Sequence, residues 1–121
     1  MVESVLIGIA VGVAAEIGAA LRRLWVYRRP VYPVLNVLLV FGLVMGTLAW
    51  AGGALGPTGL FALGFGIGLL YELVNFARLD WWYFPDDRLL GLRGKTACAL
   101  GVSVAWGTVP VTVAWLARLL P

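Results

Sequence analysis

The chain has 121 residues, of which 62% are hydrophobic and 12% charged, and its formal net charge is +3. Soluble domains carry about 25% charged residues, so this composition excludes a soluble globular fold and indicates an integral membrane protein. The single cysteine, Cys98, excludes an internal disulfide, and the absence of histidine excludes histidine-ligated metal or haem and a histidine general base. We expect no metal, no cofactor and no nucleic-acid partner.

Four apolar runs follow one another, at about 4–21, 34–51, 58–76 and 97–117. Each is about 18 to 21 residues long, close to the ~20 residues that a helix needs to cross the hydrocarbon core. The runs are continuous and do not alternate with polar residues, which predicts helices and not barrel strands. The predicted fold is an all-α membrane protein, with residues 1–121 forming one four-helix transmembrane bundle.

Basic residues concentrate in two of the connecting segments. Residues 22–33 hold four arginines, and residues 77–96 hold three arginines and a lysine, which together make eight of the nine basic residues. The positive-inside rule predicts that both segments face the cytoplasm and that both termini lie outside, in an inner or plasma membrane. Trp25, Tyr27 and Trp82 fall at the predicted inner boundary, where an aromatic belt is expected. Lipid headgroup contacts are expected from the flanking basic side chains, namely Arg28, Arg29, Arg88, Arg93 and Lys95.

A shift of 56 residues superimposes the first run on the third. Both then read G-x3-G-x3-E-x5-R-x2-W-x-Y, and Trp50 falls on Trp106 at the same shift. The pattern predicts a duplicated two-helix hairpin, residues 1–56 and 57–121. The two halves would share their orientation and be related by a pseudo-twofold axis along the membrane normal. Alternatively, the Arg-x2-Trp-x-Tyr motif marks the inner end of any inward-running helix.

One acid interrupts each of these two runs, Glu16 in the first and Glu72 in the third. Residues spaced by four share one stripe of a helix, so each acid lies on a stripe with two glycines. Glycine stripes let helices approach closely, and we expect the first and third helices to meet on them. An ionised carboxylate at membrane depth costs at least about 2.5 kcal/mol, so each acid must pair, become protonated or face water.

Two arrangements of the acids stay open. Glu16 and Glu72 would either share a proton across the pseudo-twofold axis or form crossed ion pairs with Arg78 and Arg22. Two asparagines at similar depth would complete the polar network. The candidate ion- or ligand-binding residues are Glu16, Glu72, Asn36, Asn75, Arg22 and Arg78, and no catalytic residue is predicted.

The segment AAEIGAALRRLWVYRR, residues 14–29, resembles the first helix of small multidrug-resistance transporters. Those proteins also have four helices, about this length and a membrane-embedded glutamate in helix one. The likeness is close at Ala15, Glu16, Ile17 and Gly18, and it implies that Glu16 exchanges protons and cations. The second acid at Glu72, the long third loop and the apparent repeat depart from that family's pattern.

Three functions follow from these features. The first is a small transporter or ion-conducting protein, proton- or cation-coupled, that uses the glutamate pair. Because four helices enclose little space, it would work as a homo-oligomer. The second is an accessory or assembly subunit of a larger membrane complex, whose glycine faces pack on other chains. The third is an intramembrane enzyme acting on a lipid or a polyene.

The most polar stretch is PDDRLLGLRGK, residues 85–95. Its basic residues and two glycines allow a cradle for a phosphate or a lipid headgroup, although it lacks the spacing of a P-loop. The simpler interpretation, which we favour, is a cytoplasmic loop that leads into an Asp-rich helix start.

Overall fold

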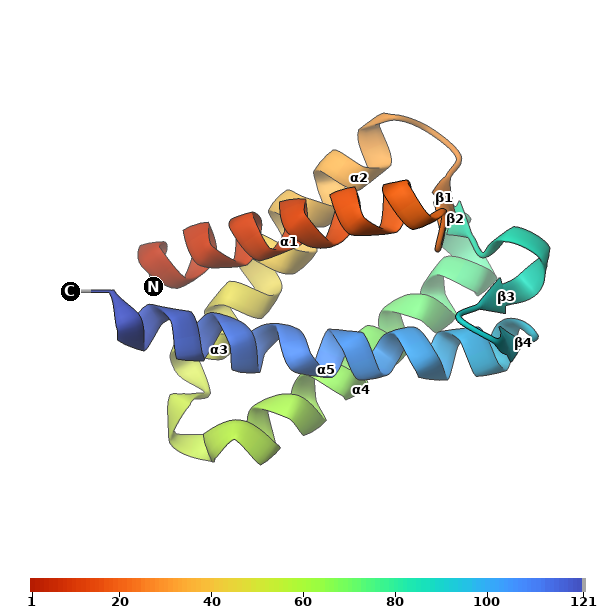
Figure 1. The fold of residues 1–121 in the computed structure, drawn as a ribbon. Helices are drawn as coiled ribbons and strands as arrows, with labels where there is room; N and C mark the ends of the chain where they lie inside the picture. Colours follow the sequence, from red (N-terminus) through yellow and green to blue (C-terminus); the bar gives the residue numbers. More distant parts are fainter. Residues whose placement is uncertain (121) are drawn as a thin grey trace.

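The computed structural model of the chain describes residues 1–120. It contains the four long apolar helices that hydropathy predicts (Figure 1), each long and apolar enough to cross a membrane. They cover Val2–Arg22, Val31–Ala51, Gly53–Leu79 and Lys95–Leu119. The protein is therefore a small polytopic membrane protein, and most of its helix ends lie one to five residues beyond the limits read from the sequence.

Two of the four helices are composite. The second consists of α2 (Val31–Leu35), the π-helical segment η1 (Asn36–Met45) and α3 (Gly46–Ala51). The third consists of the 3₁₀ turn η2 (Gly53–Leu55), α4 (Gly56–Val74) and the π-helical turn η3 (Asn75–Leu79). The first and fourth are uninterrupted, as α1 (Val2–Arg22) and α5 (Lys95–Leu119).

The four helices pack as two pairs, the first with the second and the third with the fourth. α1 lies along η1 and α3, and α4 lies along α5. α5 also contacts α1 and α3 and so joins the two pairs (Figure 1). Both termini lie at one end of the bundle and the two basic loops at the other. This is the arrangement expected from four crossings, and the side of the membrane that each end faces stays a prediction.

The glycine stripes pack inside each helix pair, so the predicted contact between the first and third helices on these stripes is wrong. An added Cβ at Gly8 would meet the backbone oxygen of Phe41, and one at Gly12 would meet the Phe41 ring. An added Cβ at Gly68 would likewise meet the Trp106 side chain. Consecutive elements of a chain are usually adjacent in space, and each stripe is covered by the next helix in the chain.

Short antiparallel strand pairs, which hydropathy did not predict, tie the loop end together. β1 (Val26–Tyr27) pairs with β2 (Trp82–Tyr83), so the first basic loop is bonded to the second. The chain reverses before each of these strands at a left-handed residue, Arg23 with φ 50° and Asp80 with φ 49°. After the 3₁₀ turn η4 (Pro85–Asp87), β3 (Arg88–Leu89) and β4 (Leu92–Arg93) form a hairpin that leads into α5. The expected Asp-rich helix start is wrong, because α5 begins at Lys95.

Candidate functional site

Glu72 on α4 is almost completely buried, with 1% of its surface exposed. Its two oxygens accept hydrogen bonds from two indole N–H groups, Trp82 Nε1 at 3.1 Å and Trp106 Nε1 at 3.2 Å. Trp106 comes from the adjacent α5, and the chain reversal at Asp80 folds Trp82 back over the end of α4. Three elements therefore converge on this one carboxylate, and both of its donors are neutral.

Glu16 on α1 is only partly buried and has a different set of donors. Its carboxylate accepts hydrogen bonds from Tyr27 Oη at 2.6 Å, Asn36 Nδ2 at 2.7 Å and Trp25 Nε1 at 3.2 Å. The reversal at Arg23 brings Trp25 and Tyr27 back over the helix end, and Asn36 reaches across from the second helix. All three donors are again neutral.

Neither carboxylate is paired with a cation. Among residues 1–120 the one ion pair joins Arg28 Nε to Asp80 Oδ2 at 2.9 Å, on the surface of the loop end. Arg22 and Arg78 lie in the last turns of their helices and are exposed. The crossed ion pairs are therefore not formed, because both arginines face away from the bundle interior and the acids face into it.

The two acids are linked through other side chains and do not touch. Asn36 donates to Glu16 and, at 2.9 Å, to the Tyr27 hydroxyl, while its Oδ1 accepts from the Tyr71 hydroxyl at 3.0 Å. The Tyr71 ring in turn packs edge-on against Trp82 and Trp106, with centroids 4.8 and 5.7 Å apart. In the described chain no hydrogen bond joins the two carboxylates, so a directly shared proton is not what this arrangement provides.

Asn75, the other predicted asparagine, holds the chain reversal instead of contacting an acid. Its Oδ1 accepts the backbone N–H of Trp81 at 2.8 Å, and its Nδ2 donates to the backbone oxygen of Trp82 at 3.0 Å. Asn75 is itself buried. It therefore positions Trp82, and it acts on Glu72 only through that indole.

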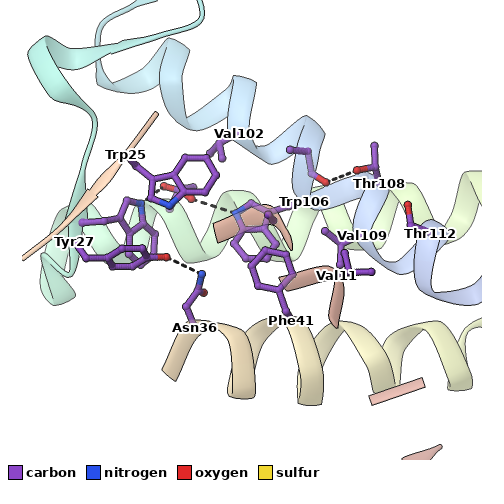
Figure 2. A pocket seen from close by; sticks show the side chains of 14 residues that line it. Val11, Trp25, Tyr27, Asn36, Phe41, Val102, Trp106, Thr108, Val109 and Thr112 are labelled. Atoms are coloured by element: carbon purple, nitrogen blue, oxygen red, sulfur yellow. Dashed lines mark hydrogen bonds between the residues drawn. The ribbon is translucent and has the colours of Figure 1, made fainter. Parts of the chain in front are cut away.

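A cavity of about 170 Å³ lies beside Glu72 and is partly open, since Ala105 and Thr108 in its lining are exposed. Figure 2 shows aromatic side chains gathered around it, with Asn36 at one edge and residues of α1 and α5, including Thr108 and Thr112, completing the wall. The aromatic lining comes from every part of the chain and comprises Trp25, Tyr27, Phe41, Trp82 and Trp106. Phe41 and Trp106 are in direct contact, with centroids 4.7 Å apart. The result is an aromatic chamber with a buried carboxylate in its wall.

Tyr27 is the phenol between Glu16 and Asn36, and it lies in the loop between the first two membrane spans. Burial raises the pKa of its hydroxyl well above the usual value for tyrosine, and the adjacent Glu16 carboxylate raises it further. Tyr27 therefore keeps its proton and remains a hydrogen-bond donor to Glu16.

The sequence interpretation missed the donors to the acids. It placed Trp25, Tyr27 and Trp82 in an aromatic belt at the membrane boundary, whereas the structure directs all three at carboxylates. Of the neighbouring aromatic residues, Trp81 stays at the surface side and stacks on Tyr32 at 4.8 Å. A buried indole needs an acceptor for its N–H. A tryptophan that follows a single acid of an apolar segment was therefore the sequence feature that could have predicted these donors.

The five basic residues expected at lipid headgroups are all exposed at the loop end. Arg28 is bound to Asp80 and lies 4.7 Å from the centroid of the Tyr83 ring. The other four form no ion pair within the described residues and are Arg29, Arg88, Arg93 and Lys95.

Comparison of the chain with protein-family models, with curated proteins and with solved structures finds no match. The resemblance to small multidrug-resistance transporters is therefore limited to residues 14–29.

Proposed function

We propose that the protein binds a small organic cation of the substituted-ammonium type in the aromatic cavity and exchanges it for protons across the membrane. The observation that carries the proposal is the environment of the Glu72 carboxyl group, which is 1% exposed, has only two neutral donors and pairs with no cation among the described residues. An ionised carboxylate at membrane depth costs at least about 2.5 kcal/mol. A cation in the adjacent cavity would supply the missing countercharge.

The cavity wall favours an organic cation over a metal ion. Calcium and magnesium take about six or more oxygen ligands, several of them water or carboxylate. This wall presents one carboxylate, one amide, the hydroxyls of Thr108, Thr112 and Tyr27, and otherwise aromatic or apolar groups. Aromatic faces attract a desolvated cation by about 2 kcal/mol or more. The wall is therefore suited to a cation that sheds its water easily, such as a methylated ammonium.

The size of the cavity restricts the ligand further. A closed apolar cavity of about 150 Å³ in another protein admits benzene, and the cavity here measures about 170 Å³. The fitting ligand has on the order of six to eight non-hydrogen atoms. Choline is an ammonium ion of this size, and 3,3-dimethylbutan-1-ol is its uncharged isostere.

Competition between a proton and the cation supplies the coupling. With the cavity empty, Glu72 has no countercharge, and a proton is the alternative means of neutralising it. Asn36 lines the cavity and donates a hydrogen bond to Glu16. A ligand in the cavity that contacts Asn36 would therefore also affect the hydrogen bonding of Glu16. We propose that Glu72 is the countercharge of the ligand and that Glu16 is the second proton-holding group. Since one chain encloses one small cavity, we expect transport to require a homo-oligomer.

Duplication of the hairpin remains part of the proposal, and corresponding contacts support it. Gly12 meets Phe41 as Gly68 meets Trp106. Each acid also accepts an indole N–H from the loop that follows its helix, from Trp25 for Glu16 and from Trp82 for Glu72, although the 56-residue shift places Trp81 and not Trp82 on Trp25. The glycine contacts pair Trp106 with Phe41 and not with Trp50. The separation from glycine to aromatic is 29 residues in the first half and 38 in the second, and the longer second half also holds the β3–β4 hairpin.

The accessory-subunit alternative loses its main support. It depended on glycine faces that would be free to pack against other chains, and those glycines are covered by the chain's own helices. A cavity lined by this chain, with a buried acid in its wall, favours a function carried out by this protein itself.

Ligand binding tests the proposal directly. The purified protein in detergent is titrated with choline and, separately, with 3,3-dimethylbutan-1-ol, and the fluorescence of the tryptophans around the cavity is followed. We expect choline to bind and its neutral isostere to bind at least about tenfold more weakly, since the isostere lacks the charge that Glu72 compensates. Choline binding should also release protons into a weakly buffered solution.

Glu72→Gln and Glu3→Gln form a matched pair of variants. Each removes one carboxylate from a helix, but Glu3 is exposed in the first turn of α1. Choline binding should be lost in Glu72→Gln and unchanged in Glu3→Gln, with both proteins still folded as judged by circular dichroism. Equal binding of choline and its isostere, or normal choline binding by a folded Glu72→Gln protein, would overturn the proposal.

A further inference from the structure

We propose that the β3–β4 hairpin is a membrane anchor that holds the phosphate of an anionic lipid between Arg88 and Arg93 and inserts Leu90 among the acyl chains. This site is separate from the cavity. It is built from three features of the hairpin, namely its direction along α5, the strained apolar residue at its tip and the two arginines paired across the strands behind the tip.

The hairpin runs back alongside the start of α5. Its inner face carries Leu89 and Leu92, and a Cβ added at Gly101 would meet both side chains. Gly101 lies six residues into α5, about 9 Å along the axis from Lys95 at ~1.5 Å per residue. The turn of the hairpin therefore points in the direction in which α5 enters the membrane (Figure 1).

The residue at the turn is an exposed leucine. Leu90 and Gly91 form the two-residue connection, with φ 48° and 89°, and 77% of the Leu90 surface is exposed. Turns of this kind favour Asn-Gly or Asp-Gly, because most side chains are strained at positive φ. Leucine here gains nothing from the turn geometry or from packing within the chain. Contact with lipid acyl chains would account for a leucine at this position.

Two arginines face each other directly behind this tip. Arg88 is paired with Arg93 across the two strands, and both side chains are exposed. Like charges at directly opposite positions repel, and within residues 1–120 no carboxylate forms an ion pair with either one. A phosphate between two guanidinium groups removes the repulsion and accepts several charge-assisted hydrogen bonds. Arg28, by contrast, is already occupied by Asp80.

The spacing of these groups fits a lipid monolayer. Arg88 precedes Leu90 by two residues, about 7 Å at ~3.4 Å per residue of strand. Interfacial segments bury their apolar side about 5–10 Å below the headgroups. Arg88 and Arg93 would then lie at phosphate level while Leu90 reaches the acyl layer, and Lys95 adds a third positive charge at the start of α5.

Lipid retention measures the phosphate site. The protein is transferred from mixed micelles containing phosphatidylglycerol or phosphatidylcholine, and bound lipid is counted by native mass spectrometry. We expect phosphatidylglycerol to be retained, and the Arg88→Gln/Arg93→Gln double variant to retain about tenfold to thirtyfold less, as two basic residues at a membrane surface contribute. The double variant Arg22→Gln/Arg23→Gln removes the same charge from another part of the loop end and should retain phosphatidylglycerol normally.

A nitroxide at the hairpin tip measures insertion. Cys98 is buried, so a Leu90→Cys variant carries the label at the tip, and accessibility to oxygen and to a water-soluble nickel chelate reports its depth in phosphatidylglycerol vesicles. We expect the label to lie below the phosphates. A label in the aqueous phase, or equal loss of lipid in both double variants, would overturn the proposal. Displacement of the lipid by soluble glycerol phosphate would also overturn it, since the ligand would then be a free phosphate.

Discussion

Glu16 and Glu72 occupy matching places in the sequence pattern but have different environments in the structure. Glu16 is partly exposed and accepts from a hydroxyl, an amide and an indole, and the hydroxyl and amide also bond each other. Glu72 is buried and accepts from two indoles, each of which has a single N–H and no acceptor to extend the network. The first acid is well solvated by the protein. Glu72 has fewer donors and almost no access to water, and it is the acid that lines the cavity.

The largest expected effect comes from removing one hydrogen-bond donor from each acid in turn and comparing the losses of stability. Trp106→Phe keeps an aromatic ring but leaves Glu72 with one donor in a buried site, and a hydrogen bond to a charged group contributes about 1.5–3 kcal/mol. We expect a loss of this size in the free energy of unfolding. Trp25→Phe should cost less than about 1 kcal/mol, because Glu16 keeps two donors and partial access to water.

Thermal unfolding in detergent, followed by circular dichroism, measures both changes. Trp50→Phe is the matched control, since Trp50 is exposed at the opposite end of the bundle and donates no side-chain hydrogen bond among the described residues. Its transition should stay at the wild-type temperature. Equal losses for Trp106→Phe and Trp25→Phe would mean that the two acids are equally compensated.

The second prediction concerns the glycines that let each acid-bearing helix approach its neighbour. Gly68→Ala forces a methyl group against the Trp106 side chain, and overpacking of this kind costs about 1–3 kcal/mol. Because the same tryptophan donates to Glu72, the variant should also weaken ligand binding.

Gly66→Ala is the control on the same helix. A Cβ at Gly66 would meet no atom within 4 Å, and alanine is favoured over glycine in a helix by up to about 1 kcal/mol. The control should therefore be neutral or slightly stabilised in the same unfolding experiment. A neutral Gly68→Ala variant would show that α4 and α5 do not pack as closely as described.

The sequence correctly predicted the number of membrane-spanning helices, because this depends on hydropathy alone. It did not predict which helices pack against each other. Four spans follow from four apolar runs, whatever the runs contact. The stripe of Gly64, Gly68 and Glu72 was likewise visible, but a stripe identifies a packing face and not the helix that covers it. In the structure α5 covers the glycine face of α4, so the first and third helices do not meet on their glycines.

For the site, too, the sequence predicted some of the side chains but not their hydrogen-bond partners. Glu16, Glu72 and Asn36 were identified because polar residues are costly in the membrane, and a costly residue is conspicuous in a sequence. Tyr71 and Trp106 were not predicted as site residues, since aromatic residues cost little in the membrane and the partners of their O–H and N–H groups are set by tertiary structure. The reversals at Arg23 and Asp80 lie in polar loops and decide which aromatic residue reaches each acid.

The third prediction uses the raised pKa of Tyr27. In the unfolded chain the phenol ionises near its ordinary pKa of about 10, whereas the folded protein keeps it protonated. The unfolded state then binds fewer protons than the folded state, so this contribution to stability is present below about pH 10 and is lost progressively above it.

Phenolate absorbance checks this assignment. Between about pH 9 and 11, the folded wild-type protein and the folded Tyr27→Phe variant should give the same absorbance change, because Tyr27 contributes nothing to it. In denaturant the two chains should differ by one tyrosine. The variant should also be less stable at neutral pH by about 1 kcal/mol, since Glu16 loses one of three donors. A difference between the folded proteins would show that Tyr27 ionises normally.

The smallest change in the free energy of unfolding is expected at the surface ion pair. Here two opposite charges are in contact in water, whereas Glu16 and Glu72 have only neutral donors. The Arg28 and Asp80 side chains are 49% and 67% exposed, and exposed pairs contribute about 0.2–1 kcal/mol. Asp80 also has φ 49°, a conformation that asparagine tolerates. Asp80→Asn removes the charge and keeps the turn, so it should lower the free energy of unfolding by less than about 1 kcal/mol. Asp80→Val, strained at this φ, should cost more, because the reversal that directs Trp82 at Glu72 depends on the backbone at residue 80 and not on its charge.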